Sequence, residues 1–152
     1  MKTEPKVFIS LKVPRGDPEL DQLATLTADL VHQAGMNPFV APYAIAENGL
    51  VNPKDFMPFA RQHALTSDLM IVYYHPELRG GLIEMGLAYA NEIPIWLCYK
   101  MPGQGDKVGQ KISSSALGCT DIKIEYDNLD TLNRKVTANL ASFREKFEIS
   151  GL

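Results

Sequence analysis

Two kinds of apolar pattern alternate along the chain: short apolar runs, and longer stretches in which apolar residues recur every three or four positions. The short runs predict β-strands. The run Leu69–Tyr74 is apolar on both faces, which is typical of a central strand in a parallel sheet. The predicted strands are Lys6–Leu11, Asn37–Ala41, Leu69–Tyr74, Ile95–Tyr99 and Asp121–Tyr126.

The stretches with helical spacing predict helices between these strands. Two of them open with a capping side chain followed by proline, at Asp17-Pro18 and at Asn52-Pro53. The first of these helices ends at Gly35. Three further helices are expected later in the chain, at Gly81–Asn91, Val108–Leu117 and Leu129–Phe147. A polar loop is expected at Gly103–Lys107.

The alternation of strands and helices implies right-handed crossovers and therefore a parallel sheet. We predict an α/β fold: a single domain over residues 1–152, with a five-stranded parallel sheet flanked by helices, flavodoxin-like or Rossmann-like. Ligands of such sheets bind beyond the carboxyl ends of the strands. The loops that matter most are therefore Lys12–Asp17, His75–Gly81 and Lys100–Lys107.

Composition and charge narrow the function classes. The 152 residues are 45% hydrophobic and carry a net charge of −3, with both signs mixed along the chain, so no basic surface for nucleic acid is expected. No apolar run approaches the roughly 18 residues of a membrane span, and the N-terminus lacks the apolar stretch of a signal peptide. Cys98 and Cys119 form no CxxC motif, and no metal-ligand spacing is found. We expect a cytoplasmic protein with reduced thiols and no metal, whose partners are neither nucleic acid nor membrane.

Glu84 is the one acidic residue in an apolar stretch that opens with Gly80 and Gly81. Two glycines where the chain leaves a strand let the backbone approach a ligand closely. We expect Glu84 in the first helical turn, where the helix dipole holds a carboxylate ionised. A fixed, ionised carboxylate can attack C1′ of a sugar, as in retaining glycosidases. The alternative is an ordinary acidic residue at a helix N-terminus.

A longer motif surrounds Glu84. It consists of Ser67-Asp68 with the apolar run that follows, the glycine pair, the segment Glu84-Met85-Gly86-Leu87-Ala88-Tyr89-Ala90, and Ile93-Pro94-Ile95. This pattern resembles the nucleoside 2-deoxyribosyltransferase family, including its branch of 2′-deoxynucleoside 5′-phosphate N-hydrolases. The resemblance implies cleavage or transfer at the N-glycosidic bond of a nucleoside or nucleotide. It implies Glu84 as the nucleophile, Gly80 and Gly81 as substrate-binding, and no cofactor.

The loop after the first strand contacts the sugar or its 5′-phosphate in this family. Ser10, Lys12 and Arg15 are the matching candidates for substrate binding, although Ile9 stands where the family has glycine. Glu77 in the second loop would repel a phosphate. Whether a 5′-phosphate is required stays open, and the balance leans slightly toward unphosphorylated nucleosides.

Further candidates come from the resemblance and from aromatic content. Tyr43 follows the second predicted strand and is a candidate for stacking on the base. Ser113 and Ser115 resemble a segment that reaches into the neighbouring subunit's site in hydrolase members, so we expect a homodimer or a higher homo-oligomer. The family's aspartate on the second helix is missing over Phe59–Ala64, where Arg61 or His63 could replace it, although His63 lies on the apolar face.

Two other function classes remain open. The missing helix acid favours a non-catalytic module that binds a nucleotide-like ligand. The opening strand KVFIS is also typical of TIR-type domains that cleave NAD. The segment Glu84–Ala88 and its continuation argue against the TIR-type alternative.

Overall fold

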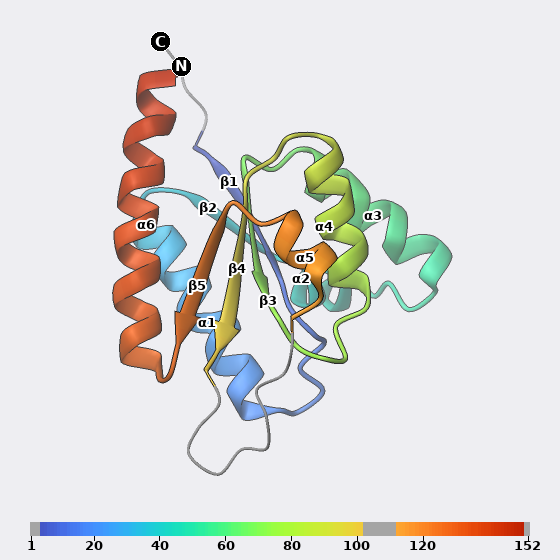
Figure 1. Ribbon diagram of the computed structural model, residues 1–152. Coiled ribbons are helices and arrows are strands. Elements are labelled where there is room, and N and C mark those ends of the chain that lie inside the picture. Colours follow the sequence, from blue (N-terminus) through green and yellow to red (C-terminus); the bar gives the residue numbers. More distant parts are fainter. Residues whose placement is uncertain (1–3, 102–111, 151–152) are drawn as a thin grey trace.

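The computed structural model describes residues 4–101 and 112–150 of the chain (Figure 1). A five-stranded sheet lies at its centre, with every pair of neighbouring strands parallel and the order β2-β1-β3-β4-β5. This confirms the predicted α/β class, and β3 is buried along its whole length, as expected of a central strand. The strands are β1 (Lys6–Ser10), β2 (Asn37–Val40), β3 (Leu69–Tyr73), β4 (Ile95–Lys100) and β5 (Ile122–Tyr126).

Helices cover both faces of the sheet and form a three-layer structure (Figure 1). One face packs against α1 (Pro18–Gln33) and α6 (Leu129–Ser150). The other face packs against α2 (Ala41–Glu47), α3 (Pro53–Leu65), α4 (Gly80–Ala90) and α5 (Ser114–Gly118). No helix in residues 4–101 or 112–150 is long and apolar enough to cross a membrane.

Strand β1 distributes its side chains between the two faces with the expected period of two. Val7 and Ile9 belong to the core under α1 and α6, whereas Phe8 belongs to the core under α2 to α5. By the same alternation, Ser10 at the end of β1 faces the layer that contains α4. The register pairs Ser10 with Val72 of β3, which fixes the position of this serine within the sheet.

The predicted helix starts are confirmed by their capping hydrogen bonds. The Asp17 side chain accepts a hydrogen bond from the Glu19 backbone amide at 3.0 Å, and the Asn52 side chain accepts one from that of Lys54 at 2.9 Å. In both helices the proline at the first position has no N–H group that would need a partner. Short-range chemistry therefore fixes where these two helices begin.

Two expectations about elements require correction. The second strand ends at Val40, and Ala41 begins α2, which the sequence analysis did not predict. The segment APYAIAE combines good helix formers with a proline in the first turn, where proline is tolerated. The helix expected over Val108–Leu117 is described only as α5, and residues 108–111 lie outside the described part of the chain, as does the loop Gly103–Lys107.

Candidate active site

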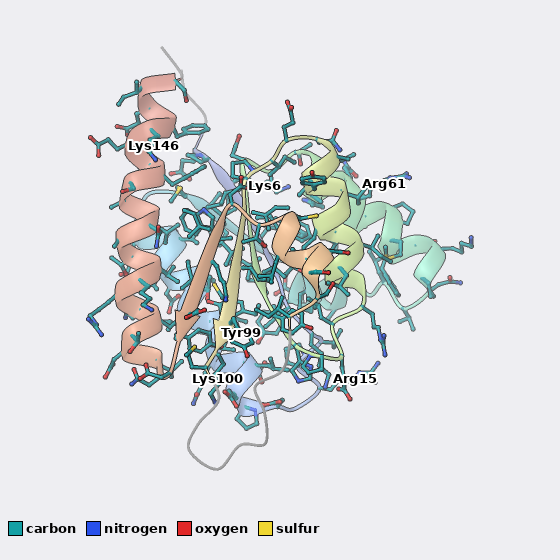
Figure 2. All side chains as sticks on the ribbon, viewed as in Figure 1. Lys6, Arg15, Arg61, Tyr99, Lys100 and Lys146 are labelled. Atoms are coloured by element: carbon teal, nitrogen blue, oxygen red, sulfur yellow. The ribbon has the colours of Figure 1, made fainter. Side chains whose placement is uncertain are left out.

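A cavity of about 580 Å³ opens where the strand order reverses. In the sheet, β2 lies on one side of β1 and β3 on the other. The loops that follow β1 and β3 both border the cavity. Such switch points are the usual ligand sites of open α/β sheets. Figure 2 shows Arg15, which lines this cavity, at the same end of the sheet as Lys100 and opposite to Lys6. Two of the three loops selected from the sequence therefore meet at one site.

Glu84 lines this cavity and is almost completely buried, with 6% of its surface exposed. The hydroxyl of Ser10 donates a hydrogen bond to Glu84 Oε1 at 2.9 Å. This is the one hydrogen bond to the Glu84 side chain among the described residues. Glu84 Oε2 therefore has no protein partner in the described part of the chain.

The expected position of Glu84 in the first helical turn is wrong. Helix α4 starts at Gly80 and carries no acidic residue in its first turn, so Glu84 lies in the second turn, beyond the free amides. Burial instead raises the pKa of Glu84 to about 7, and the hydrogen bond from Ser10 opposes this by favouring the ionised form.

Gly80 and Gly81 both line the cavity, but only Gly81 is tightly enclosed. A Cβ atom at Gly81 would lie 2.6 Å from Leu78 Cδ1 and 2.7 Å from Ser10 Oγ, both far inside normal contact distance. A Cβ atom at Gly80 would meet nothing within 4 Å. The absent side chain of Gly81 is thus what lets the end of β1 approach α4.

Three cations line the cavity from the two loops. Lys12 pairs with Glu77 at 2.6 Å, and this contact lowers the pKa of the Glu77 carboxyl. Arg15 and Arg79 are exposed and form no ion pair with any described residue. The mouth of the cavity therefore presents two guanidinium groups that form no ion pair with a described residue, although Arg79 still acts electrostatically on Glu77.

No protein-family model and no curated protein matches the sequence. Solved structures do match. The CMP N-glycosidase BcmB of Clostridium botulinum aligns with a TM-score of 0.59 at 16% identity, over 88% of this chain and 98% of that one. A 2-deoxyribosyltransferase from Bacillus psychrosaccharolyticus aligns with a TM-score of 0.57 at 16% identity, over 89% and 95%. The solution structure of BlsM aligns with a TM-score of 0.64 at 16% identity, over 95% and 94%.

The chain has the fold of the nucleoside 2-deoxyribosyltransferases.

Within this deoxyribosyltransferase fold, Tyr43 lies outside the cavity lining. Its ring packs against the core under α1, and its hydroxyl donates a hydrogen bond to Asp21 of that helix. Burial and the Asp21 carboxylate raise the pKa of Tyr43 to about 12. The unpredicted helix α2 turns this ring toward α1 rather than toward the cavity.

Ser113 and Ser115 also lie outside the cavity of their own subunit. Ser113 caps α5, where its hydroxyl oxygen accepts a hydrogen bond from the Ala116 amide at 3.5 Å. Ser115 is exposed. Their predicted contact with a neighbouring subunit stays a prediction.

An apolar wall that the sequence analysis missed occupies the side of the cavity formed by α2 and α3. No acid from these two helices lines it. Arg61 projects outward from α3 (Figure 2), and the half-buried His63 stacks on Phe39 with ring centroids 4.1 Å apart, so neither side chain lines the cavity. Helical spacing could have identified the α3 part of the wall, but the α2 part required α2 to be predicted. The wall consists of Ala41, Pro42, Ile45, Phe56, Met57 and Ala60.

Proposed function

We propose that this protein cleaves or transfers at the N-glycosidic bond of a (deoxy)nucleoside or nucleotide, with Glu84 as the nucleophile. One observation carries the proposal: a buried carboxyl group lines the switch-point cavity with one oxygen held and the other without a protein partner. The structural neighbours support it, because one is named a CMP N-glycosidase and another a 2-deoxyribosyltransferase.

The proposed reaction has two displacements at the sugar carbon C1′. Glu84 Oε2 forms a bond to C1′ while the C1′–N bond breaks, and the base leaves with the electron pair of that bond. An acceptor, either water or a second base, then attacks C1′ and releases the Glu84 carboxylate; the proton that the acceptor loses balances the one that the departed base takes up. The pKa of about 7 suits this role, since an appreciable fraction of the group is ionised at neutral pH yet little solvated.

The experiment that tests the function is incubation with deoxynucleosides, ribonucleosides, their 5′-monophosphates and NAD, with released base measured by liquid chromatography. We expect base release from at least one nucleoside or nucleotide, and base exchange when a second base is added if the protein is a transferase. Binding without release would support the non-catalytic module. Release of nicotinamide from NAD alone would support the TIR-type alternative.

The cations at the cavity mouth favour a substrate with a 5′-phosphate. Lys12 pairs with Glu77, so the carboxylate that the sequence analysis weighed against phosphate is already paired, while Arg15 and Arg79 form no ion pair with a described residue. Arginine binds phosphate through charge-assisted hydrogen bonds. We therefore propose that a nucleoside 5′-monophosphate is preferred over the nucleoside.

The preference predicts opposite effects of two substitutions. We expect kcat/KM to be at least about tenfold higher for the monophosphate than for the nucleoside. Arg15→Ala should reduce that ratio, whereas Glu77→Gln should increase it because Lys12 becomes available. Arg61→Ala, at an exposed position on α3 (Figure 2), serves as the control because Arg61 does not line the cavity. Equal kcat/KM values for both substrates, unchanged by Arg15→Ala, would contradict the preference.

Helix α4 presents an apolar outer surface that supports the proposed homodimer. Leu82, Ile83 and Tyr89 are 41%, 56% and 59% exposed, and the only charged residue of α4 is the buried Glu84. Exposed apolar helix faces of this kind commonly mark protein interfaces. A second copy packed here would also meet the layer that contains α5 with Ser113 and Ser115.

Sedimentation velocity at micromolar concentration should therefore show a dimer. Ile83→Asp should shift the protein to monomer, because desolvation of a charge in an apolar interface weakens dimerisation by on the order of 3 kcal/mol or more. Ile149→Asp on α6, also an exposed isoleucine, is the matched control and should remain dimeric. A wild-type protein that is monomeric and fully active would refute the assembly.

The thiols support a proposed cytoplasmic location. Cys98 is buried and Cys119 partly buried, and neither forms a disulfide within the described residues. Free thiols are typical of reducing compartments such as the cytoplasm.

A further inference from the structure

Ser10 differs from the other candidates of the first loop in its burial. Only 1% of its surface is exposed, and it does not line the cavity, whereas Lys12 and Arg15 do. A buried hydroxyl needs a hydrogen-bond partner, and Ser10 finds Glu84, 74 residues further along the chain. The position that the sequence suggested for phosphate binding is therefore occupied by a group that contacts the proposed nucleophile.

We propose that Ser10 is a positioning residue that holds Glu84 Oε1 and thereby directs Oε2 into the cavity. This inference rests on the proposed function for its catalytic consequence, but the contact itself exists independently of any reaction. Ser10 touches Glu84 rather than a substrate, so it acts through the nucleophile.

The surroundings of Ser10 fix the direction of its hydroxyl. Its backbone belongs to the β1–β3 ladder through the pairing with Val72, so the strand holds the Cα atom in place. Its Oγ atom occupies space that a side chain at Gly81 would take, at 2.7 Å from the position of an added Cβ. Strand β1 and helix α4 are therefore joined at this point by close packing as well as by the hydrogen bond to Glu84.

The effect of this contact on charge has a definite sign. The Ser10 hydroxyl donates a hydrogen bond to Oε1 and so stabilises the ionised carboxylate, which lowers the pKa of Glu84. Burial has the opposite and larger effect. The other charged groups that face the cavity are Lys12 and Arg15 from the β1–α1 loop and Glu77 and Arg79 from the β3–α4 loop. Helices α2 and α3 contribute only apolar side chains. Removal of the hydroxyl should therefore raise the pKa of Glu84 further.

The experiment measures the titration of Glu84 directly. Protein labelled with ¹³C at the glutamate carboxyl carbons is titrated by NMR, with the Glu84 signal assigned as the one that disappears in Glu84→Gln. In Ser10→Ala we expect the titration midpoint to lie about one pH unit higher than in the wild type. Ser10→Cys replaces the hydroxyl with a slightly larger and weaker donor, and it should show an upward shift in the same direction. It also provides the measurement if Ser10→Ala does not fold.

Kinetics give a second readout. The acidic limb of kcat/KM against pH should move upward in Ser10→Ala by the same amount as the NMR midpoint, with kcat lowered more than KM is raised. An unchanged Glu84 midpoint in both variants would overturn the positioning role even if the enzyme is active. Absence of base release by the wild type would overturn the proposed function, while the NMR midpoints would still decide whether Ser10 controls Glu84.

Discussion

Replacement of Glu84 by glutamine should reduce the rate of base release by at least about a thousandfold, with the fold intact. Glutamine keeps the shape of the side chain and can still accept the hydrogen bond from Ser10 through its amide oxygen. It cannot form a stable glycosyl ester, because an amide is a far weaker nucleophile than a carboxylate. The measurement is single-turnover release of base at pH 8, where the wild-type carboxyl is mostly ionised. Retention of more than about a tenth of wild-type activity would falsify the assignment of Glu84 as nucleophile.

The same substitution should increase stability at high pH. Because the folded state raises the pKa of Glu84 from 4.5 to about 7, it binds this proton more tightly than the unfolded chain. The resulting stabilisation is complete below about pH 4.5 and is lost as pH rises through about 7. Glutamine does not ionise, so Glu84→Gln does not lose stability as pH rises. Its free energy of unfolding should exceed that of the wild type by up to about 3 kcal/mol at pH 8, with little difference at pH 4.

A matched control separates this effect from a general change of charge. Glu145→Gln removes a carboxylate from the exposed surface of α6, away from the cavity of Glu84, and should alter neither base release nor the pH dependence of unfolding. Urea unfolding at both pH values measures all three proteins. If Glu84→Gln and Glu145→Gln respond alike, Glu84 does not have the raised pKa that its burial implies.

The fold was largely predictable because its signals are local. The strands were visible as apolar runs, and the starts of α1 and α3 were visible as Asp17-Pro18 and Asn52-Pro53, since capping involves residues only two or three apart. Helix α2 was missed because Pro42 in its first turn also reads as the end of a strand. That single error placed Tyr43 at the ligand, whereas its hydroxyl contacts Asp21.

The site was predictable in part: features carried by neighbouring residues were found, and contacts between residues far apart in the sequence were not. Glu84 was recognisable because its glycine-rich surroundings lie within the same segment. Its partner Ser10 belongs to another strand, and the two meet only when β1 pairs with β3 and α4 packs onto the sheet. The pKa of Glu84 was predicted with the wrong sign for the same reason, since burial is a property of the folded chain and the helix register decides whether free amides are within reach.

Gly81→Ala should lower both folding stability and kcat, whereas Gly80→Ala should lower neither. The two glycines are adjacent, both line the cavity, and both lie in the first turn of α4, so the substitutions make nearly the same chemical change. The two positions differ in the room available for the added methyl group. At position 81 it would press on Leu78 and on Ser10 Oγ, while at position 80 it meets nothing within 4 Å.

The consequences follow from what the methyl group at position 81 displaces. Relief of the clash requires α4 to move from β1 or Ser10 to rotate, and such overpacking typically costs about 1–3 kcal/mol of stability. Either adjustment lengthens the contact between Ser10 and Glu84, so Oε2 loses its fixed direction and kcat should fall by about ten- to a hundredfold. Gly80→Ala should keep kcat and gain up to about 1 kcal/mol from the higher helix propensity of alanine. Urea unfolding and kcat, measured side by side on the two variants, test this. Equal behaviour of the pair, in either direction, would show that the close approach of β1 to α4 at Gly81 does not control the position of Glu84.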